Sequence, residues 1–408
     1  MHERNIFYSF RVQEELLNIN NSLVWGKAHY SYKVVKNKYI NLLQSKNLKV
    51  CEIIRPEIYK HKIAFNFLKD FKAGNIHLIF KPFEEIRTLK GAYNIGIVAW
   101  EFDRINTKTF DSVPLSNHLR ILSMLDEVWV LCEYTKKVLQ QYNLKNVYCI
   151  PAPVDYPILN KKTSVKDLLG GFPAVKLDTI NLEQQKVFFT LYNDLKYIKK
   201  TYLTIINPWD KRKNIEDVVT SFAKFSNKYK QALLIIKLVI DNQGTTLVNI
   251  NEIIAEKVKL KSSNIIFISQ NLTDDQMNAL MQSVDYYYCM SKAEGQNLPL
   301  IEAMSIGTVP VSVTHTAMTD YINEDNAFTI KSSLESTPID ANASRNSALH
   351  WYKPEFKSAI KALETSYQAS ISEYKIKSNN CIKTVESIYS DRAVFDKIIQ
   401  RINLIIND

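Results

Sequence analysis

Short apolar runs alternate with longer amphipathic stretches along most of this chain, and this alternation limits the folds open to it. In the first half the apolar runs are NIFYSF (5–10), LKVCEII (48–54), IHLIF (76–80), NIGIVAW (94–100), EVWVLC (127–132) and NVYCIPA (146–152). Residues 25–45 and 133–143 return apolar residues at helical intervals between such runs. Strands joined by crossover helices form a parallel sheet covered by helices. We therefore predict an α/β, doubly wound domain.

The alternation loosens between residues 155 and about 200, around Gly170, Gly171 and Pro173, and then begins again. The later runs are TYLTIIN (201–207), ALLIIKLVI (232–240), NIIFISQ (264–270), VDYYYCMS (284–291) and TVPVSV (308–313), and residues from 353 onward have a helical pattern. A chain of 408 residues with 46% hydrophobic content can bury two cores. We predict Rossmann-like domains over 1–175, with a linker extending to about 200, and over 200–385. Residues 386–408 are predicted to form a helix that returns to the first domain.

Composition narrows the location and the partners. The five cysteines have no metal-ligand or redox spacing, which is typical of a reducing compartment. The first residues lack a signal-peptide pattern and no apolar run reaches membrane-spanning length, so we predict a cytoplasmic protein. The formal net charge of +10 favours anionic partners. Because the basic residues are spread along the chain without a nucleic-acid-binding motif, we do not predict nucleic acid among them.

The stretch AEGQNLPLIEAM (293–304) follows one predicted strand and precedes Gly307 and the next strand. Asn297 suits a helix N-cap, Pro299 suits a first helical turn, and Gly307 can end the helix in a left-handed conformation. Glu294 then lies on the loop from strand to helix, and Glu302 lies inside the helix. The backbone N–H groups at the start of this helix would favour an anion such as a diphosphate.

This stretch resembles the glycosyltransferases of family 4, which retain the anomeric configuration and have the two-domain GT-B fold. The common form in that family is EGFGLPxxEAM, and this chain has EGQNLPLIEAM, with Gln296 and Asn297 in place of the Phe-Gly pair. The resemblance implies that Glu294 contacts the donor sugar near its reacting carbon and that Glu302 binds the ribose of the nucleotide. It also implies donor contacts from Gly295, Gln296, Asn297 and Leu298. The polar Gln296 and Asn297 leave the identity of the donor sugar open.

A second resemblance covers TYLTIINPWDKRKNIEDVVTSFAKF (201–225), which is similar to the opening of the donor domain in this family. The family places cations at this point for the donor diphosphate, and Arg212 and Lys213 match them. Cations arranged in advance stabilise the charge that a departing nucleoside diphosphate gains. Lys211 could take the place of either neighbour, and an exposed basic turn is the alternative interpretation of the whole cluster.

The first half resembles the acceptor domain of bacterial members of the family, through NIGIVAWEFDRI and the segment from Leu125 to Asp155. Many relatives have a histidine in the cleft after the central strand, whereas this chain has Trp100 and Glu101. Glu101 is therefore the candidate base or polar contact on the acceptor side, with a structural or surface glutamate as the alternative. His315, directly after a strand, and Gly26, before the first long helix, are further candidates for donor contacts.

The resemblance implies a hexosyltransferase of polysaccharide or glycoconjugate biosynthesis, with the two domains facing a cleft and C-terminal helices crossing back to the first. The donor would be a UDP- or GDP-sugar, and the acceptor a glycan, a lipid-linked glycan or a protein. No Asp-x-Asp triplet occurs in the sequence, so we predict no metal and no other cofactor. The positive charge leaves room for peripheral attachment to the inner membrane face. The alternatives are a noncatalytic GT-B subunit that binds glycan or nucleotide, and a GT-B epimerase or phosphorylase.

Overall fold

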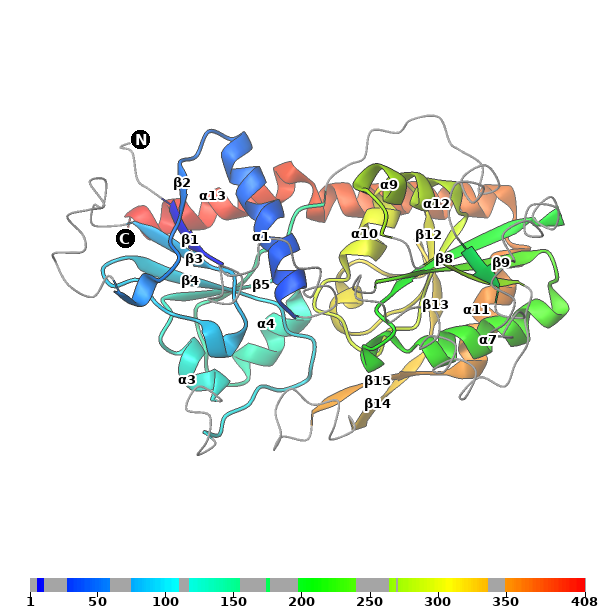
Figure 1. Cartoon of the computed structure of the whole chain (residues 1–408), viewed down its shortest axis with the longest axis horizontal. Helices are drawn as coiled ribbons and strands as arrows, with labels where there is room; N and C mark the ends of the chain where they lie inside the picture. Colours follow the sequence, from blue (N-terminus) through cyan, green and yellow to red (C-terminus); the bar gives the residue numbers. More distant parts are fainter. Residues whose placement is uncertain are drawn as a thin grey trace. The chain divides into compact units, whose positions relative to one another are not determined.

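The computed structural model describes residues 6–10, 28–58, 75–109, 117–154, 174–176, 197–239, 264–268, 271–336 and 349–407. The chain divides into two compact units (Figure 1). Unit 1 comprises residues 1–154, 336–350 and 388–408, and unit 2 comprises residues 155–335 and 351–387. The chain therefore passes between the units more often than one linker and one returning helix would require, because residues 336–350 belong to unit 1.

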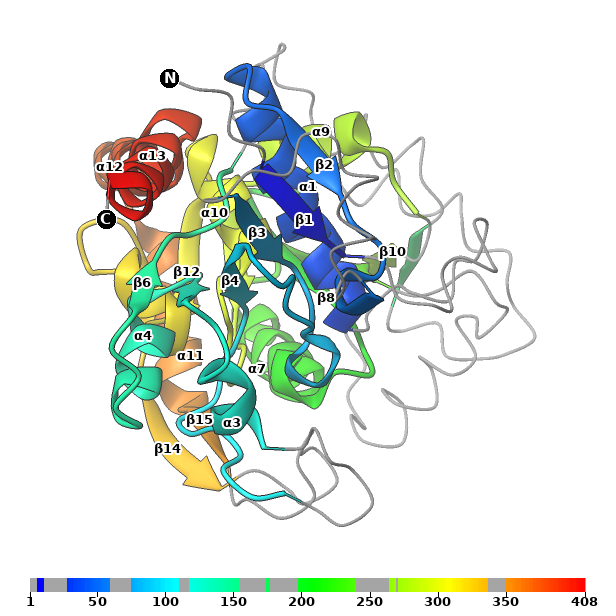
Figure 2. The same cartoon turned by 90° about the vertical axis from the view of Figure 1, so that its left-hand side faces the viewer.

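Unit 1 is built on a six-stranded parallel sheet with the strand order β2-β1-β3-β4-β5-β6. Figure 2 shows β2, β1, β3 and β4 following one another in this order. The strands are β1 (Ile6–Ser9), β2 (Val50–Glu52), β3 (Ile76–Ile79), β4 (Tyr93–Val98), β5 (Glu127–Val130) and β6 (Val147–Cys149). The helices in this part are α1 (Ala28–Ser45), α3 (His118–Leu122) and α4 (Glu133–Gln140), with short 3-10 turns at Pro56–Ile58 and Phe83–Glu85. Each predicted strand of the first half is confirmed.

Unit 2 contains a seven-stranded sheet with the order β13-β12-β11-β8-β9-β10-β7. Its strands are β7 (Ala174–Lys176), β8 (Lys200–Ile206), β9 (Ala232–Leu238), β10 (Ile265–Ile268), β11 (Tyr286–Cys289), β12 (Val309–Val313) and β13 (Phe328–Ile330). All neighbours pair in parallel except β7 and β10, which are antiparallel. The predicted first domain ran to residue 175, but β7 pairs in the second sheet, so Ala174 and Val175 belong with unit 2.

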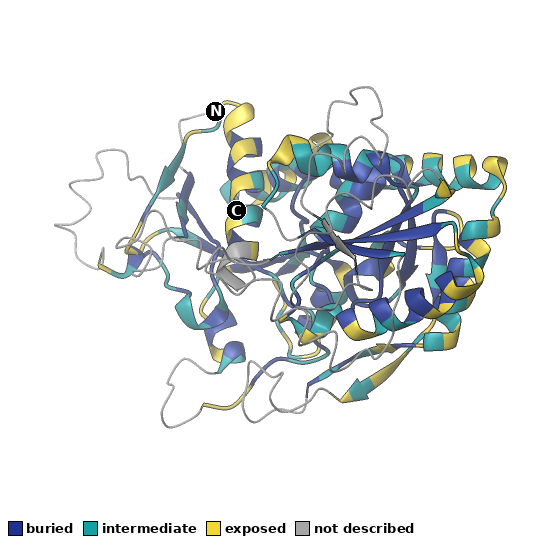
Figure 3. Ribbon diagram, turned by 45° about the vertical axis from the view of Figure 1, so that its right-hand side comes forward, coloured by how far each residue is buried: buried dark blue, intermediate teal, exposed yellow. Residues whose placement is uncertain are grey.

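The core of unit 2 explains why its apolar runs could be recognised in the sequence. Every residue of β9 and of β11 is buried, as the dark blue strands of Figure 3 show. Helices α7 (Ile215–Lys228), α9 (Asp274–Ser283) and α10 (Leu298–Ser305) connect the strands, and 3-10 turns lie at Lys211–Lys213 and Thr316–Asp320. The Tyr202 and Tyr286 rings stack with their centroids 5.0 Å apart, and Phe222 lies edge-on to Tyr202. Burial of such aromatic rings supplies much of the free energy of folding.

A two-stranded sheet of β14 (Ser332–Ser336) and β15 (His350–Pro354) precedes the C-terminal helices and was not predicted. Its strands carry exposed polar residues as well as the exposed Leu334. They therefore lack the apolar run by which a strand can be predicted from sequence. The helical pattern predicted from residue 353 onward corresponds to α11 (Phe356–Gln368), α12 (Ile371–Tyr389) and α13 (Asp391–Asn407). Pro354 ends β15 instead of opening the first of these helices.

Helix α13 packs within unit 1. The Arg401 guanidinium forms an ion pair with Glu127, a fully buried carboxylate at the start of β5. Trp129 Nε1 donates a 2.8 Å hydrogen bond to the same carboxylate, so its charge is satisfied from two directions. Among the described residues, none of the helices combines the length and the apolar content that crossing a bilayer needs.

Candidate functional site

The loop after β8 places three charged residues at the carboxyl edge of the second sheet, where ligands bind in parallel α/β sheets. Asp210 caps the 3-10 turn Lys211–Lys213, because its Oδ1 accepts the Arg212 backbone N–H at 3.0 Å. The Arg212 guanidinium also contacts the Asp210 carboxylate, with Nη2 2.6 Å from Oδ2 and Nε 3.1 Å from Oδ1. Burial would raise the pKa of Asp210, but Arg212 and Lys213 outweigh burial and lower it. The Arg212 guanidinium is thus fixed before any ligand binds.

Lys213 and Glu294 form an ion pair that joins this loop to the loop after β11. Lys213 Nζ lies 2.6 Å from Glu294 Oε1, and 19% of the lysine side chain and 6% of the glutamate side chain are exposed. Burial lowers the pKa of Lys213, but the Glu294 carboxylate outweighs it, so the net pKa is raised. The two loops are joined at their backbones as well, because Lys292 N–H donates to Arg212 O at 2.7 Å and Arg212 Nη1 donates to Ala293 O at 3.3 Å.

Helix α10 begins directly after this loop, as predicted, but its N-terminus is built differently. Asn297 occupies the N-cap with φ 63° and ψ 59°, a left-handed conformation, and its side chain makes no capping hydrogen bond. Its carboxamide turns inward and donates to Cys289 Sγ at 3.4 Å. Asparagine tolerates the left-handed region better than most residues, so Asn297 can adopt the backbone that a glycine would take. Asn214 opens α7 in the same way, with φ 56° and without a side-chain cap.

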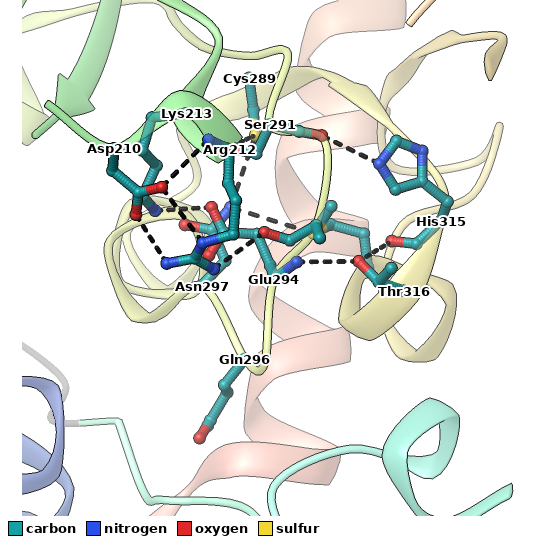
Figure 4. A network of polar contacts seen from close by, with 12 residues as sticks. Asp210, Arg212, Lys213, Cys289, Ser291, Glu294, Gln296, Asn297, His315 and Thr316 are labelled. Atoms are coloured by element: carbon teal, nitrogen blue, oxygen red, sulfur yellow. Dashed lines mark hydrogen bonds and ion pairs between the residues drawn. The ribbon is translucent and has the colours of Figure 1, made fainter. Parts of the chain in front are cut away.

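The other predicted residues of this motif lie around the same helix start. Gly295 and Leu298 flank the Gln296-Asn297 pair, and Leu298 is the first residue of α10. The Gln296 side chain is buried and points away from the charged cluster, as Figure 4 shows. Gly307 has φ 83° and follows the end of α10, which confirms the predicted left-handed stop.

Glu302 is half-buried on α10, one helical turn beyond the loop. Burial first, and then the charges of Cys289, Glu294 and Glu302 among others, raise the pKa of the fully buried Tyr287 on β11. Both glutamates of the motif therefore lie within electrostatic reach of one tyrosine. The structure brings Arg212, Lys213, Glu294 and Glu302 to the same edge of the second sheet.

His315 lies beside this cluster, but its ring is engaged by protein groups. Its Nδ1 is 2.7 Å from Ser332 Oγ and its Nε2 is 2.9 Å from Ser291 O. The Tyr352 ring stacks on it at 4.5 Å with an interplanar angle of 10°. Burial lowers the pKa of His315 to about 4, so the ring is neutral at pH 7. Through these contacts the ring connects the loop at Ser291 to the β14–β15 sheet. The sequence predicted a donor contact for His315, whereas both ring nitrogens contact protein groups.

The candidates of the first domain lie in unit 1. Glu101 is half-buried on the loop after β4. The hydroxyl of the nearby Tyr32 accepts the Ala99 N–H at 3.2 Å. Burial raises the pKa of Tyr32, and the charges of Glu101, Glu84 and Glu85 raise it further. Because Glu101 comes shortly after the end of β4, it lies near the carboxyl edge of the first sheet. Gly26 falls outside the described residues. Among those residues, no group of three or more acidic, histidine or cysteine side chains is arranged to hold a metal ion.

Sequence reasoning missed two residues of the site. Asp210, which holds Arg212, stood next to the basic cluster and could have been found as its nearest acid. Thr316 is the other residue, because its Oγ1 accepts a 3.1 Å hydrogen bond from the Glu294 N–H. No feature of the sequence indicates this contact.

Comparisons with known proteins bear on the segment that carries this cluster and on the fold. Residues 193–341, which contain the cations and both glutamates, match the family described as glycosyl transferases group 1. A glycosyltransferase from Rickettsia africae superposes with a TM-score of 0.60 at 11% identity and with complete coverage of both chains. The fold is therefore GT-B. TarM of S. aureus, a point mutant in complex with fondaparinux, α-GlcNAc-glycerol and UDP, gives a TM-score of 0.54 at 14% identity over 83% of this chain and 58% of its own.

A curated relative covers part of the chain only. A protein of Acidianus filamentous virus 2, whose name assigns it provisionally to the glycosyltransferases, is 24% identical over 147 residues, or 36% of this chain and 40% of the viral protein. The family match and the charged cluster thus coincide in unit 2, while unit 1 is related to known proteins through its fold.

Proposed function

We propose that this protein is a glycosyltransferase that moves a sugar, in the simplest case a hexose, from a nucleoside-diphosphate donor to an acceptor hydroxyl. The observation that carries the proposal is the 2.6 Å contact between Lys213 and Glu294 inside the segment that matches glycosyl transferases group 1. It brings a cation suited to a diphosphate and a carboxylate suited to a sugar ring onto adjoining loops. Binding of UDP by TarM supports UDP as a donor nucleotide, with GDP as the other candidate.

Charge explains how the cluster would hold the donor. The loop after β8 carries positive charges on Lys211, Arg212 and Lys213 and a negative charge on Asp210, so it offers positive charge to an anion even with Glu294 paired to Lys213. The N–H groups at the start of α10 add a favourable partial charge. The Lys213 ammonium would bind the diphosphate, and Glu302 would accept hydrogen bonds from the ribose. Gly295, Gln296, Asn297 and Leu298 would face the sugar and the phosphates.

In the proposed reaction the bond between the anomeric carbon and the diphosphate oxygen breaks, and the acceptor oxygen bonds to the same face of the sugar, which retains its configuration. The transition state resembles an oxocarbenium ion that departs from the diphosphate. Lys213 and Arg212 stabilise the negative charge of the leaving group, and Glu294 stabilises the positive charge of the ring. The acceptor proton passes to the leaving phosphate, or to Glu101 if unit 1 binds the acceptor.

The acceptor belongs to the class of glycans, lipid-linked glycans or proteins, as in polysaccharide or glycoconjugate synthesis at the cytoplasmic face of a membrane. The net charge of +10 supports attachment to an anionic surface of this kind. These assignments rest on the resemblance of the sequence and on charge, and they narrow the choice of acceptors for an assay.

The proposal is tested with the full chain and a panel of UDP-glucose, UDP-N-acetylglucosamine, UDP-galactose and GDP-mannose, with candidate acceptors added. We expect one donor to release its nucleoside diphosphate in step with sugar transfer. Proton NMR is expected to show that the sugar in the product has the same anomeric configuration as in the donor. Binding of a nucleotide without any turnover would favour a noncatalytic subunit. A rearranged donor without acceptor would favour an epimerase, and phosphate-dependent cleavage a phosphorylase.

Metal independence is part of the proposal, because Arg212 and Lys213 supply the charge that a divalent cation would otherwise bring to the diphosphate. We expect turnover to be unchanged by EDTA and unchanged by added Mg²⁺ or Mn²⁺. Loss of turnover in EDTA that Mn²⁺ restores would contradict this part, while leaving sugar transfer itself in place.

A further inference from the structure

Thr316 has the least expected backbone conformation in the part of the chain that the structure describes. Its φ is 52°, in the left-handed region, and the other non-glycine residues with positive φ there are the asparagines 47, 143, 214 and 297. A branched side chain in this region is a genuine outlier, because its Cβ substituents crowd the backbone. Such strain persists only where surrounding contacts hold it, and it tends to occur at functional sites.

The strained turn holds the backbone of Glu294 on both sides. Thr316 Oγ1 accepts the Glu294 N–H at 3.1 Å, and the next residue, Ala317, donates its N–H to Glu294 O at 3.2 Å. The Thr316 hydroxyl donates in turn to His315 O at 2.8 Å. One hydroxyl can both donate and accept, so Thr316 uses both capacities at once. Figure 4 shows Thr316 directly beside Glu294.

Other contacts hold the turn at residues 315 and 316 in place, so the turn can keep the Glu294 backbone at one position. His315 is tied to Ser291 O and Ser332 Oγ, as described above, and Thr316 is 1% exposed. Beyond the turn, Tyr321 Oη donates to Gln296 O at 2.9 Å, which fixes the loop again two residues after Glu294. The Glu294 carboxylate is held by Lys213, and its peptide groups are held by residues 316 and 317.

We propose that Thr316 is a positioning residue for Glu294 and that its hydroxyl is the reason a strained threonine occupies this place. The proposal rests on the function proposed above, because it assigns Thr316 to the same site. A glycine would adopt φ 52° without strain but would offer no acceptor to the Glu294 N–H. A valine would keep the shape of threonine and lose the same acceptor. Serine would keep the hydroxyl with less crowding.

The test compares Thr316→Val, Thr316→Gly and Thr316→Ser with the wild type, using nucleoside diphosphate release from the UDP- and GDP-sugar panel. A displacement of about 1 Å at a reacting group can cost about 100-fold in rate. We expect Val and Gly to lower kcat by about 10- to 100-fold with KM changed little, and Ser to keep kcat within about threefold of the wild type. The Gly variant covers the case in which the Val variant does not fold. Equal kcat in Ser and Val, or an effect on KM alone, would overturn the proposal.

A second measurement does not depend on turnover. Hydrogen exchange of the peptide that contains Glu294 is expected to be faster in the Val and Gly variants than in the wild type, and unchanged in the Ser variant. If the wild type turned over no nucleotide sugar, the proposed function would fail while this measurement still decided whether the hydroxyl holds Glu294. Unchanged exchange in all three variants, in an active protein, would remove Thr316 from its role and leave the function standing.

Discussion

The loops after β4 and after β11 occupy the same place in the two sheets, but they are held by different forces. In unit 1 the loop after β4 packs around the Trp100 ring, and its polar contacts go to protein groups, as where Thr135 Oγ1 donates to Trp100 O and Asp103 Oδ2 lies 2.8 Å from His350 Nδ1. Trp100 lies edge-on to Phe83, Phe102 and His118, with centroids 5.2, 5.3 and 5.4 Å away. In unit 2 the loop after β11 is held by the Lys213–Glu294 ion pair and by hydrogen bonds to Thr316 and Ala317.

This difference supports the proposal that unit 2 carries the donor site. Apolar packing fixes shape but offers little to a charged ligand, whereas charges held in advance stabilise charge that develops in a reaction. A buried ion pair gives little stability in itself, because desolvation offsets the attraction. The charged loop of unit 2 is therefore better explained by ligand binding than by folding.

The largest expected effect separates the two glutamates. Glu294→Gln keeps the shape of the side chain and removes its charge, and we expect kcat to fall by about 100- to 1,000-fold, as when one preorganised electrostatic group is lost. We expect Glu101→Gln to lower kcat by less, because the leaving phosphate can also take the proton of the acceptor. Glu386→Gln, on the exposed face of α12, is the matched control. Steady-state release of nucleoside diphosphate measures all three. A larger loss in Glu101→Gln than in Glu294→Gln would reverse the comparison.

The second prediction concerns stability. Lys213→Met leaves the Glu294 carboxylate buried without its cation, and breaking a buried pair costs about 3–5 kcal/mol of unfolding free energy. Because 19% of the Lys213 side chain is exposed, the lower end is expected. The double variant Lys213→Met, Glu294→Leu should recover most of this loss in urea unfolding and remain inactive. A double variant as unstable as the single one would indicate that the pair serves folding.

One glycine in each unit allows a comparison of how the two units tolerate an added Cβ. At Gly307 a Cβ would lie 2.5 Å from Ser378 Oγ, and φ is 83°. At Gly96, in β4 of unit 1, a Cβ would lie 2.6 Å from the Leu125 Cδ1 methyl group and 3.9 Å from Ile86 Cδ1. We expect Gly307→Ala to lower the unfolding free energy by about 1–2 kcal/mol from the left-handed backbone alone. Gly96→Ala should cost less, because the half-buried Leu125 can move aside. Thermal unfolding that ranked Gly96→Ala as the more harmful change would contradict this account.

A pH effect that is absent at neutral pH concerns one buried histidine in each unit. Burial lowers the pKa of His77 in unit 1 and of His315 in unit 2 to about 4, from an ordinary value of 6.5. Between these values the unfolded chain binds more protons than the folded one, so stability is complete above pH 6.5 and falls as the pH drops toward 4. Each histidine adds a slope of at most about 1.4 kcal/mol per pH unit.

Replacing each histidine in turn locates its share of this slope. His77→Gln and His315→Gln should each flatten the stability profile from pH 6.5 to 4 in urea unfolding. Only His315→Gln should also lower kcat, because the His77 ring contacts Asn94 Oδ1 and Ser9 Oγ within the first sheet. Equal effects on kcat from the two variants would show that the tie at His315 has no special relation to the site.

The sequence predicted the strands well because buried parallel strands are continuous apolar runs, such as ALLIIKLVI around β9. It also predicted the loop–helix setting of Glu294, since Pro299 and Gly307 mark the two ends of a short helix. It could not predict β14, whose residues SSLES carry no apolar signal. Nor could it predict Thr316, because the left-handed conformation of a threonine is imposed by tertiary contacts against its own preference.

The most direct test of the central claim, that the charged cluster of unit 2 binds the donor diphosphate, is calorimetric titration of the full chain with UDP and with GDP in EDTA. Removing the Lys213 ammonium also exposes the ligand to the unpaired Glu294 carboxylate. We expect Lys213→Met to weaken binding of the preferred nucleotide at least about tenfold, the worth of one charge-assisted hydrogen bond. Lys211→Met, an exposed cation of the same turn, should weaken it less. Equal affinity in Lys213→Met and the wild type would contradict the account.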